Sequence, residues 1–316
     1  MATPNSNFDA IASTTLKKYR KKFADNVSNG NVLLKYLNMK GKVTTKGGDT
    51  LVEELMYAVG NGGSYSEADT MTVTKPEGLS AAEFNWKQEY ATITITGTDK
   101  LRNSGSEKMQ SLLEARAKQA EITMSNRLGT LIYGDGTGNG GKDILGLSAI
   151  VSTAPTTGIL GGINRATYSF WRNQTNASVG SFASGGLSAM GSMVRSLTRG
   201  VDRPKVIVTG DTVFGYLESV ANGKAQFNNP QLADLGFHAL KFEGIDVLYD
   251  PQCTADRMYF LNTDYLHLRV HPDLDFKTTD FVIPADQDVS VAKVLWAGQL
   301  TVSNCALQGV LAGFSA

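Results

Sequence analysis

One long amphipathic helix constrains the fold of this 316-residue chain more than any other stretch. Ser104 and Glu107 match the S-x-x-E capping pattern, and Gly134 is suited to end the helix. The apolar residues that recur on one face are Met109, Leu113, Ala117, Ala120, Met124, Leu128 and Leu131. A helix over 105–133 is about 43 Å long at ~1.5 Å per residue, whereas a compact sphere of this chain length is about 50 Å across. The helix therefore predicts an elongated or plate-like body.

The residues before this helix, 51–98, do not fit a compact core. TMTVTK at 70–75 and FNWKQEYATITIT at 84–96 alternate as strands do and predict a two-stranded ribbon. In the second strand Phe84, Trp86 and Tyr90 share one parity, whereas the isoleucines of TITIT take the other. The two ends of that strand are therefore expected to bury against different surfaces. Because a two-stranded ribbon is barely stable alone, its exposed aromatic side chains predict a neighbouring chain.

The rest of the chain mixes strands and helices irregularly, which predicts the α+β class. RPKVIVTG at 203–210 is typical of a buried strand, and Asp211 is suited to cap the helix that follows. KGKVTTKGGD at 40–49 is polar and glycine-bearing and predicts a loop. The later strand-rich segments are FEGIDVLYDPQC, RMYFLNTDYLHLRV and AKVLWAGQLTVSNCALQGVL.

Charge is balanced overall but uneven along the chain. With 30 Lys and Arg against 30 Asp and Glu, the formal net charge is zero, so the whole chain is not a general binder of polyanions. Residues 1–50 nevertheless hold nine basic and three acidic side chains, a balance of +6. Leu16, Tyr19, Phe23 and Val27 recur at helical spacing beside KKYRKK. This basic helix is either a solvated face or an arm that contacts an acidic partner.

The cysteines and the apolar runs indicate the compartment. Cys253 and Cys305 suggest no disulfide framework, and the N-terminus shows no signal-peptide pattern. No apolar run reaches the roughly 18 residues of a membrane span. We therefore expect a soluble protein that folds in a reducing cytosol and has no membrane partner.

The glycine-rich stretch 134–141 is a candidate nucleotide site. Gly136, Gly138 and Gly141 satisfy G-x-G-x-x-G, but in a dinucleotide site this motif follows a strand and opens a helix. Here it follows a long helix, which favours a flexible helix exit. Asp135 and the next residues partly imitate a calcium loop, but the twelfth position is Gly146 where a glutamate is needed.

Other catalytic and metal signatures are also weak. His267 and His271 lie in a strand-like stretch, and four strand residues span about 13 Å, too far for one metal ion. His238 is isolated, and no serine stands in G-x-S-x-G. Cys253 and Cys305 have no nucleophile signature and are interpreted as small apolar residues. The sequence predicts no catalytic residue, no cofactor and no metal site.

Several segments in a fixed order carry a family resemblance. They are the long capped helix after an aromatic ribbon, its exit GDGTG, GLSAIV, GGINRATYSFWRNQ, FEGIDVLYDPQCTADRMYFLNTDYLHL and LWAGQLTVSNCALQGVL. From about residue 45 onward the chain resembles the major capsid proteins of tailed bacteriophages. No single motif is as specific as a metal signature, so the resemblance depends on the joint order.

The resemblance implies the Hong Kong 97-type capsid fold, with an N-terminal arm, an extended β-hairpin loop, a long spine helix, and peripheral and axial domains. Laid onto this sequence, it implies an arm at 1–50 and an extended loop at 51–98. It then implies a peripheral domain at 99–175 with the spine helix at 105–133, an axial domain at 176–289, and C-terminal strands at 290–316 that return to the peripheral domain.

Contacts between subunits also follow from the resemblance. The ribbon is expected to lie over an adjacent subunit, with Tyr65, Phe84, Trp86 and Tyr90 in contact. In GGINRATYSFWRNQ, most of the aromatic side chains are expected in the core, with a strand or helix start at Tyr168–Trp171. Arg165 and Arg172 are expected to pair with carboxylates of neighbouring subunits. An inner-face or scaffold contact is expected of Lys17, Lys18, Arg20, Lys21 and Lys22.

The implied function is a major capsid protein, not an enzyme, that self-assembles into hexamers and pentamers of an icosahedral head enclosing double-stranded DNA. The segment before the arm is short, so a separate scaffolding protein is expected, together with a portal. No motif identifies a Lys–Asn cross-link. The alternatives are an encapsulin-like nanocompartment, a nucleotide-dependent enzyme that uses 134–141, and a tail or decoration protein. The expected location is the virion, after assembly in the host cytoplasm.

Overall fold

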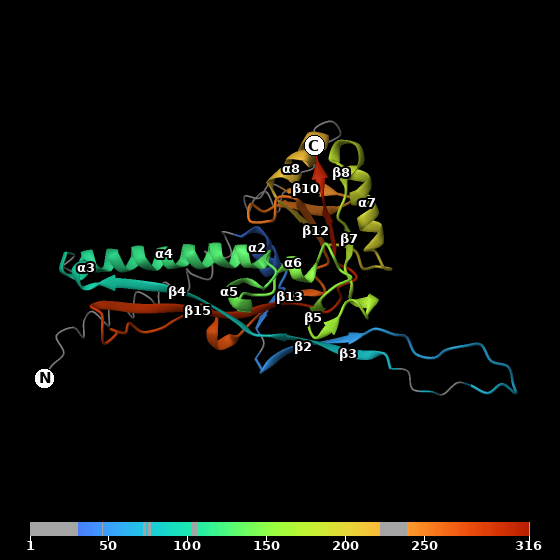
Figure 1. The fold of residues 1–316 in the computed structure, drawn as a ribbon, viewed down its shortest axis with the longest axis horizontal. Helices are drawn as coiled ribbons and strands as arrows, with labels where there is room; N and C mark the ends of the chain where they lie inside the picture. Colours follow the sequence, from blue (N-terminus) through green and yellow to red (C-terminus); the bar gives the residue numbers. More distant parts are fainter. Residues whose placement is uncertain are drawn as a thin grey trace.

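The computed structural model describes residues 31–45, 47–71, 74, 77–102, 106–221 and 239–315. The described chain has three parts, which Figure 1 shows side by side. A long limb consists of one helix lying over a narrow sheet. A second lobe rises from one end of the limb, and a thin protrusion leaves this junction in the direction away from the limb. The elongated body that the helix predicted is confirmed.

The long helix is α4 (Ser106–Ile132), which has 27 residues and agrees with the predicted 105–133 to within one residue at each end. The stripe members from Leu113 to Leu131 are all buried. The Gly134 N–H donates to the Leu131 carbonyl at 2.9 Å and closes the last turn. Ser104 and the side chains of Glu107 and Met109 lie outside the described residues. The helix therefore presents one apolar face to the sheet beneath it.

The limb sheet is built on β15 (Val289–Val302), a strand of 14 residues. β4 (Lys87–Thr96) pairs antiparallel with one edge of β15, from Lys87↔Gly298 to Thr96↔Val289. The strands on the other side are β13 (Leu266–Val270), β14 (Lys277–Thr278) and, beyond β13, β1 (Val43–Thr45). Alternate residues of β4 and β15, such as Ile93 and Val294, are buried in one core with the α4 stripe. The predicted loop at 40–49 is wrong at β1, because β1 gains a parallel partner in β13.

The second lobe surrounds a six-stranded sheet. In spatial order its strands are β10 (Ala239–Phe242), β11 (Ile245–Tyr249), β9 (Val206–Thr209), β12 (Arg257–Leu261), β16 (Gly309–Ala312) and β7 (Gln174–Asn176). All four residues of β9 are buried, so the predicted buried strand is confirmed. Two helices, α7 (Leu187–Ser196) and α8 (Asp211–Ala221), share a second apolar core with this sheet. The mixture of both sheets and the helices is an α+β arrangement.

The C-terminal segment 290–316 divides between the limb and the second lobe. β15 lies in the limb, but β16 pairs with β12 and β7 in the second lobe. Where the chain passes from one sheet to the other, a reciprocal hydrogen-bond pair joins the fully buried Gln308 to Asn262. The Asn262 N–H donates to Gln308 Oε1 at 2.9 Å, and Gln308 Nε2 donates to the Asn262 carbonyl at 3.0 Å. This pair holds the chain beside β12 at the point where it leaves the limb.

The predicted ribbon is rearranged. β2 (Thr50–Met56) pairs with β3 (Leu79–Asn85), and the chain then breaks at Trp86 before β4. The prediction of one strand over 84–96 is therefore wrong, but the switch of the buried face is confirmed, because Phe84 is buried before the break and Ala91 after it. Of the strand predicted at 70–75, the described residues Thr70, Met71 and Thr74 belong to no strand.

A helix that the sequence did not reveal lies near the junction of the two sheets. α2 (Val32–Met39) is capped by Asn31, whose Oδ1 accepts from the Leu34 N–H. The buried Asp250 accepts from the Leu33 N–H at 3.2 Å and from the Tyr133 hydroxyl at 2.7 Å. One carboxylate therefore holds α2 and the exit of α4. The remaining short helices and strands are α3 (Gly97–Arg102), α5 (Gly138–Gly141), α6 (Leu147–Ile150), β5 (Ile159–Leu160), β6 (Ile163–Asn164), β8 (Gly180–Ser181) and β17 (Phe314–Ser315).

Candidate functional site

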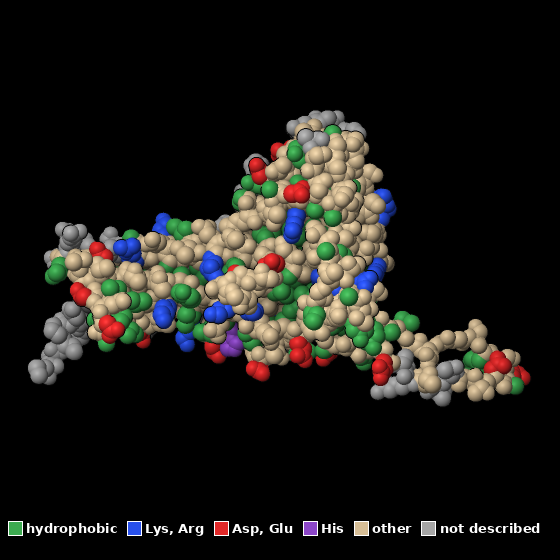
Figure 2. Space-filling view, in the orientation of Figure 1, with side chains coloured by type: hydrophobic (Ala, Val, Ile, Leu, Met, Phe, Trp, Pro, Cys, Tyr) green, Lys and Arg blue, Asp and Glu red, His purple; other side chains and the backbone are tan. Residues whose placement is uncertain are grey.

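The candidate site is the protrusion Tyr57–Gly78 and the surface from which it leaves the body. Figure 2 shows it as a thin finger with little of the body around it. Its base is closed by the Tyr57 N–H, which donates to the Gly78 carbonyl at 2.9 Å. Further out, Asn61 Nδ2 donates to the Thr74 carbonyl at 2.7 Å and joins the two legs. Val59 and Tyr65 are 86% and 69% exposed, so the described chain leaves these apolar surfaces uncovered.

The strands below the protrusion are anchored by a buried ion pair. Glu53 of β2 is buried, and Arg269 of β13 donates to it from Nε at 3.0 Å and from Nη2 at 3.2 Å. The Thr301 hydroxyl donates to the same carboxylate at 2.9 Å, and Arg269 Nη1 donates to Thr44 Oγ1 at 2.6 Å. Charge-assisted, bidentate hydrogen bonds of this kind fix geometry as well as adding attraction. The base of the protrusion is therefore fixed to the limb.

A two-glycine turn packs against β3 at the base of the protrusion. Gly161 and Gly162 join β5 to β6 with φ of +56° and +78°, as a two-residue type I′ turn requires. The Glu83 N–H donates to the Gly161 carbonyl at 3.0 Å. A Cβ on Gly161 would lie 2.9 Å from the Ala82 methyl and 3.1 Å from the Phe84 ring, so the ring packs directly on the turn. Only glycine allows this close approach.

Phe84 is therefore not an exposed contact, and that part of the ribbon prediction is wrong. Its side chain is only 3% exposed and belongs to the limb core with Leu51, Leu55 and Ala82. The sequence placed Phe84 correctly on an apolar face. The covering surface is the turn at 159–164, which is about 75 residues away in sequence and was therefore not predicted.

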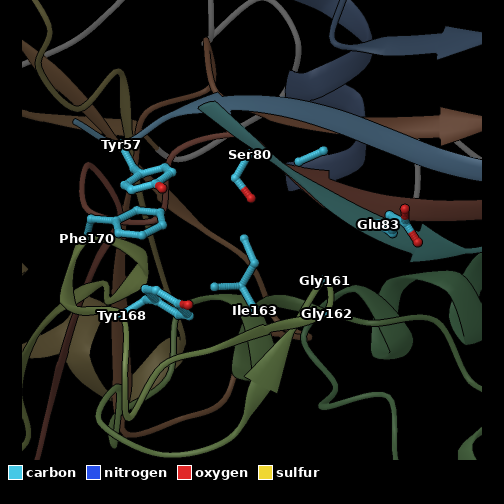
Figure 3. A pocket seen from close by; sticks show the side chains of 9 residues that line it. Tyr57, Ser80, Glu83, Gly161, Gly162, Ile163, Tyr168 and Phe170 are labelled. Atoms are coloured by element: carbon cyan, nitrogen blue, oxygen red, sulfur yellow. The ribbon is translucent and has the colours of Figure 1, made fainter. Parts of the chain in front are cut away.

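A half-open pocket of about 410 Å³ lies between β3 and this turn (Figure 3). The rings of Tyr57 and Phe170 stack with centroids 5.0 Å apart and planes inclined by 16°, and Tyr168 tilts against Phe170 at 5.9 Å. Ile163 lies between these rings and β3 (Figure 3). The sequence did not predict that Tyr57 and Ile163 line one pocket, because they are more than 100 residues apart in the chain.

The stretch GGINRATYSFWRNQ is mainly an internal support. Arg165 is only 3% exposed, and its guanidinium donates to the Ala149 carbonyl at 2.9 Å and to the Ile150 carbonyl. These carbonyls belong to α6, so the buried cation is held by the end of a helix of its own chain. The predicted pairing of Arg165 with a neighbour's carboxylate is therefore wrong.

The other side chains of this stretch also bond within the chain. Arg172 donates to the Arg165 and Ala166 carbonyls, both at 2.6 Å. Trp171 is buried, as predicted, and its Nε1 donates to the Leu160 carbonyl at 2.9 Å. Tyr168 is exposed, and the expected strand or helix start is a 3₁₀ turn at Ser169–Trp171. An outward role for Arg172 stays a prediction.

The remaining predicted contacts differ in exposure. Tyr90 is 64% exposed on the outer face of β4, so it is available to a neighbour, as is Tyr65. Trp86 is half-buried, donates from Nε1 to the Gly48 carbonyl at 2.8 Å and meets the His271 ring edge-on at 5.2 Å. The basic residues Lys17, Lys18, Arg20, Lys21 and Lys22 lie outside the described residues.

The glycine loop after α4 does not fit a phosphate. α5 is a single turn with Asn139 and Gly140 at φ of 52° and 68°, so it offers no regular helix N-terminus. The Asp143 carboxylate lies against Gly138, and Lys87 donates to the Gly141 carbonyl. Asp135 accepts from Thr137 N–H at 3.0 Å, and these hydrogen bonds lower the pKa of Asp135. The loop therefore lacks the regular helix N-terminus that holds a phosphate in a dinucleotide site, which argues against the nucleotide-enzyme alternative.

Histidine and cysteine chemistry is equally limited. His267 lies in β13, where burial lowers its pKa, and no cluster of metal-binding side chains occurs within the described ranges. Cys253 and Cys305 are both buried free thiols, in agreement with the sequence interpretation. Burial raises the pKa of both thiols, that of Cys305 to about 12, so neither is an activated nucleophile.

Comparison with known proteins identifies the fold. No protein-family model matches the sequence, and no curated protein matches it. The cyanophage A-1(L) capsid asymmetric unit matches at 17% identity with a TM-score of 0.67, over 87% of this chain and 91% of that chain. The capsid of the native GTA particle matches at 12% identity with a TM-score of 0.59, over 89% and 90%. The holo-SrpI encapsulin complex from Synechococcus elongatus PCC 7942 matches at 8% identity with a TM-score of 0.53, over 86% and 84%.

At these identities the likeness establishes the fold. The chain has the Hong Kong 97-type capsid fold, in the α+β class, as the sequence resemblance implied. None of the helices in the described part of the chain combines the length and the hydropathy that crossing a bilayer requires.

Proposed function

We propose that this chain is a major capsid protein, which self-assembles into hexamers and pentamers of an icosahedral phage head around double-stranded DNA. The proposal rests on one observation. A capsid fold that extends over most of the chain carries a protrusion whose apolar side chains its own body does not cover. In such a protein the function is mechanical and needs no catalytic residue.

The division of the protrusion into an anchored base and an uncovered outer part fits this role. The base is held by Glu53 and by Phe84 within the chain, so its direction is fixed before assembly. The outer part exposes Val59, Tyr65 and Met71 to a neighbour. Standard protein interfaces bury about 1,600 Å² in total, and an overlapping protrusion adds area beyond a flat edge contact. Assembly then depends on many modest contacts repeated by symmetry.

The partners follow from the same proposal. Identical subunits are the main partner, with a separate scaffolding protein and a portal during assembly in the host cytoplasm. The basic run Lys17–Lys22 meets the scaffold or the inner face, and the DNA is enclosed without sequence specificity. Because the full chain has no net charge, DNA contact is local and depends on such basic segments.

The test is expression of the full chain, with and without its neighbouring phage genes, followed by sedimentation and electron microscopy. We expect closed shells with hexameric and pentameric capsomers. A protein that stays monomeric under both conditions contradicts the proposal. Tubes or open rings alone favour a tail or decoration protein instead.

An encapsulin-like compartment is the second candidate, because the holo-SrpI encapsulin complex shares the fold. The two differ in contents. A phage head contains nuclease-protected DNA and needs packaging functions, whereas a compartment encloses protein and no genome. The ratio of absorbance at 260 and 280 nm of particles purified from infected cells, with mass spectrometry of the contents, separates them.

A further inference from the structure

The pocket beside β3 has walls of two chemical kinds. Figure 3 shows three aromatic rings on one side of Ile163 and the Glu83 side chain on the other side. The rings belong to Tyr57, Phe170 and Tyr168. The volume of about 410 Å³ lies within the roughly 300–1,000 Å³ that is usual for small-molecule sites. The pocket therefore has the size of a ligand site, and its two ends differ in chemistry from its middle.

The Glu83 end carries a negative charge that no neighbouring cation balances. The Glu83 side chain is exposed, and none of the described residues forms an ion pair with it. Of the described residues that line the pocket, none is a lysine, arginine or histidine. An ionised carboxylate only accepts hydrogen bonds, and apolar walls focus its field. This end therefore suits a cation that donates N–H groups, and it disfavours an anion.

The aromatic end also favours a cation. The rings of Tyr57 and Phe170 stack on each other, and Tyr168 beside them is 48% exposed. The face of an aromatic ring is electron-rich and attracts a cation within about 6 Å of the ring centroid. Among the described residues, no group bonds to the hydroxyl groups of Tyr57 and Tyr168, so both oxygens can accept from an N–H donor.

The middle of the pocket is apolar and open. Ile163 and Ala81 line it with methyl groups, and a Cβ on Gly162 would have no atom within 4 Å. A neutral apolar molecule fits this middle, but it covers the Glu83 carboxylate without a partner, which is costly. A cation without an apolar part matches one end only. A chain of methylene groups with a cation at each end matches all three parts.

We propose that this pocket binds a linear aliphatic diamine. One ammonium group donates to the Glu83 carboxylate, the methylene chain lies over Ile163, and the second ammonium group lies at the rings of Tyr57 and Tyr168. A hydrogen bond between ionised groups is about twice as strong as a neutral one, so the Glu83 end supplies most of the affinity. The whole site belongs to one chain, so binding does not depend on assembly and is a property beyond the proposed shell function.

Isothermal titration calorimetry of the unassembled full chain tests the site, with diaminobutane as the probe and a constant ionic strength. Butylamine has the same carbon chain with one ammonium group, and butanediol has that chain with none. We expect saturable binding of diaminobutane. Butylamine is expected to bind about two- to fivefold more weakly, as the loss of a cation–π contact at an exposed ring predicts. Butanediol is expected not to bind.

Two variants assign the ends of the ligand. Glu83→Gln keeps the size of the side chain and removes its charge, and we expect it to weaken diaminobutane binding by at least about tenfold. Glu218→Gln, at an exposed site on α8, is the matched control and is expected to leave the affinity unchanged. Tyr168→Leu removes a ring and its hydroxyl group, so it is expected to reduce the advantage of diaminobutane over butylamine. Thermal unfolding of each variant checks that its fold is kept.

Several results would overturn the proposal. Heats that do not saturate, or equal affinities of the wild type and Glu83→Gln, mean that the amine associates with the general surface and not with this pocket. An advantage of diaminobutane over butylamine that Tyr168→Leu leaves unchanged contradicts the position of the second ammonium group. All of these results leave the proposed function intact, because the titrations use the unassembled chain.

Discussion

Replacing Phe84 by alanine distinguishes a folding role from an assembly role for the base of the protrusion. The ring is 3% exposed and packs against Gly161 and the limb core. Truncation removes the buried ring, and the type I′ turn that faces it has little freedom to collapse into the space. Tyr65→Ala is the matched control, because the Tyr65 ring is 69% exposed.

The expected loss for Phe84→Ala is about 3–5 kcal/mol in the free energy of unfolding, the usual range for a buried phenylalanine. Tyr65→Ala is expected to change it by less than ~0.5 kcal/mol, as exposed substitutions do. Because the free energy of unfolding of a domain is roughly 5–15 kcal/mol, the larger loss leaves a measurable fraction of the subunits unfolded. Phe84→Ala is therefore expected to lower the amount of folded subunit, and Tyr65→Ala the amount of assembled shell.

Urea unfolding of the unassembled chain measures the first quantity, with tryptophan fluorescence as the signal. Trp86, Trp171 and Trp296 all lie in or beside the limb core and report on it. Sedimentation of assembly reactions measures the second quantity. Equal unfolding free energies for wild type and Phe84→Ala, together with lost assembly, would show that Phe84 serves a neighbour and that its packing within the chain is unimportant.

Three further perturbations test the structural account. Arg269→Met leaves Glu53 buried without its cation and is expected to cost about 3–5 kcal/mol of unfolding free energy; an unchanged urea midpoint contradicts the anchoring role. Gly161→Val combines a φ of +56° with a clash of the new Cβ against Ala82 and Phe84, so we expect hydrogen exchange in β3 to rise. Gly162→Val is the control, because its φ is +78° but a Cβ there has no atom within 4 Å, and its effect on exchange should be smaller. Equal exchange in the two variants would show that backbone strain alone matters. Burial raises the pKa of the Cys305 thiol from 9.0 to about 12, so its stabilising contribution, complete below pH 9, is lost as pH rises toward 12. In the Cys305→Ala variant, Tm should fall less steeply between pH 9 and pH 12 than in the wild type. A curve of Tm against pH that runs parallel to that of the wild type would refute the raised pKa of Cys305.

Local periodicity predicted the long helix α4 and the buried strand β9 well, because each depends on its own sequence. The apolar residues from Leu113 to Leu131 recur on one helix face, and that face is buried. The strand VIVT is apolar or small at every position, and all four residues are buried. The change in which alternate residues are buried, between Phe84 and Ile93, was also predicted from the sequence. In each case the pattern of apolar positions alone specifies which side chains are buried.

Errors arose where a distant segment supplies the partner. The strand 84–96 breaks because β3 pairs with β2 and β4 pairs with β15, and neither partner is adjacent in sequence. Arg165 was expected outside, but α6 provides carbonyl groups that bind a buried guanidinium. β1 has a polar sequence and forms only because β13 offers an edge. Such pairings depend on tertiary packing, which overrides local preference.

The candidate site was predictable in outline only. The glycine-rich, polar sequence between Tyr57 and Gly78 indicated a segment outside the core, and Tyr65 and Tyr90 are exposed as expected. The prediction that all of 51–98 depends on a neighbouring copy is wrong. Leu51, Leu55 and Ala82 pack within the chain, and β4 belongs to the limb sheet. Among the described residues of 51–98, the outer part of the loop and single side chains such as Tyr90 remain uncovered.

Cryo-electron microscopy of particles formed by the full chain tests the central claim most directly, because it shows at once whether copies assemble and what covers the protrusion. We expect closed icosahedral shells in which the protrusion Tyr57–Gly78 of each copy lies on the limb of another. A chain that remains a monomer at high concentration, or shells in which the protrusion folds back onto its own body, contradicts the account.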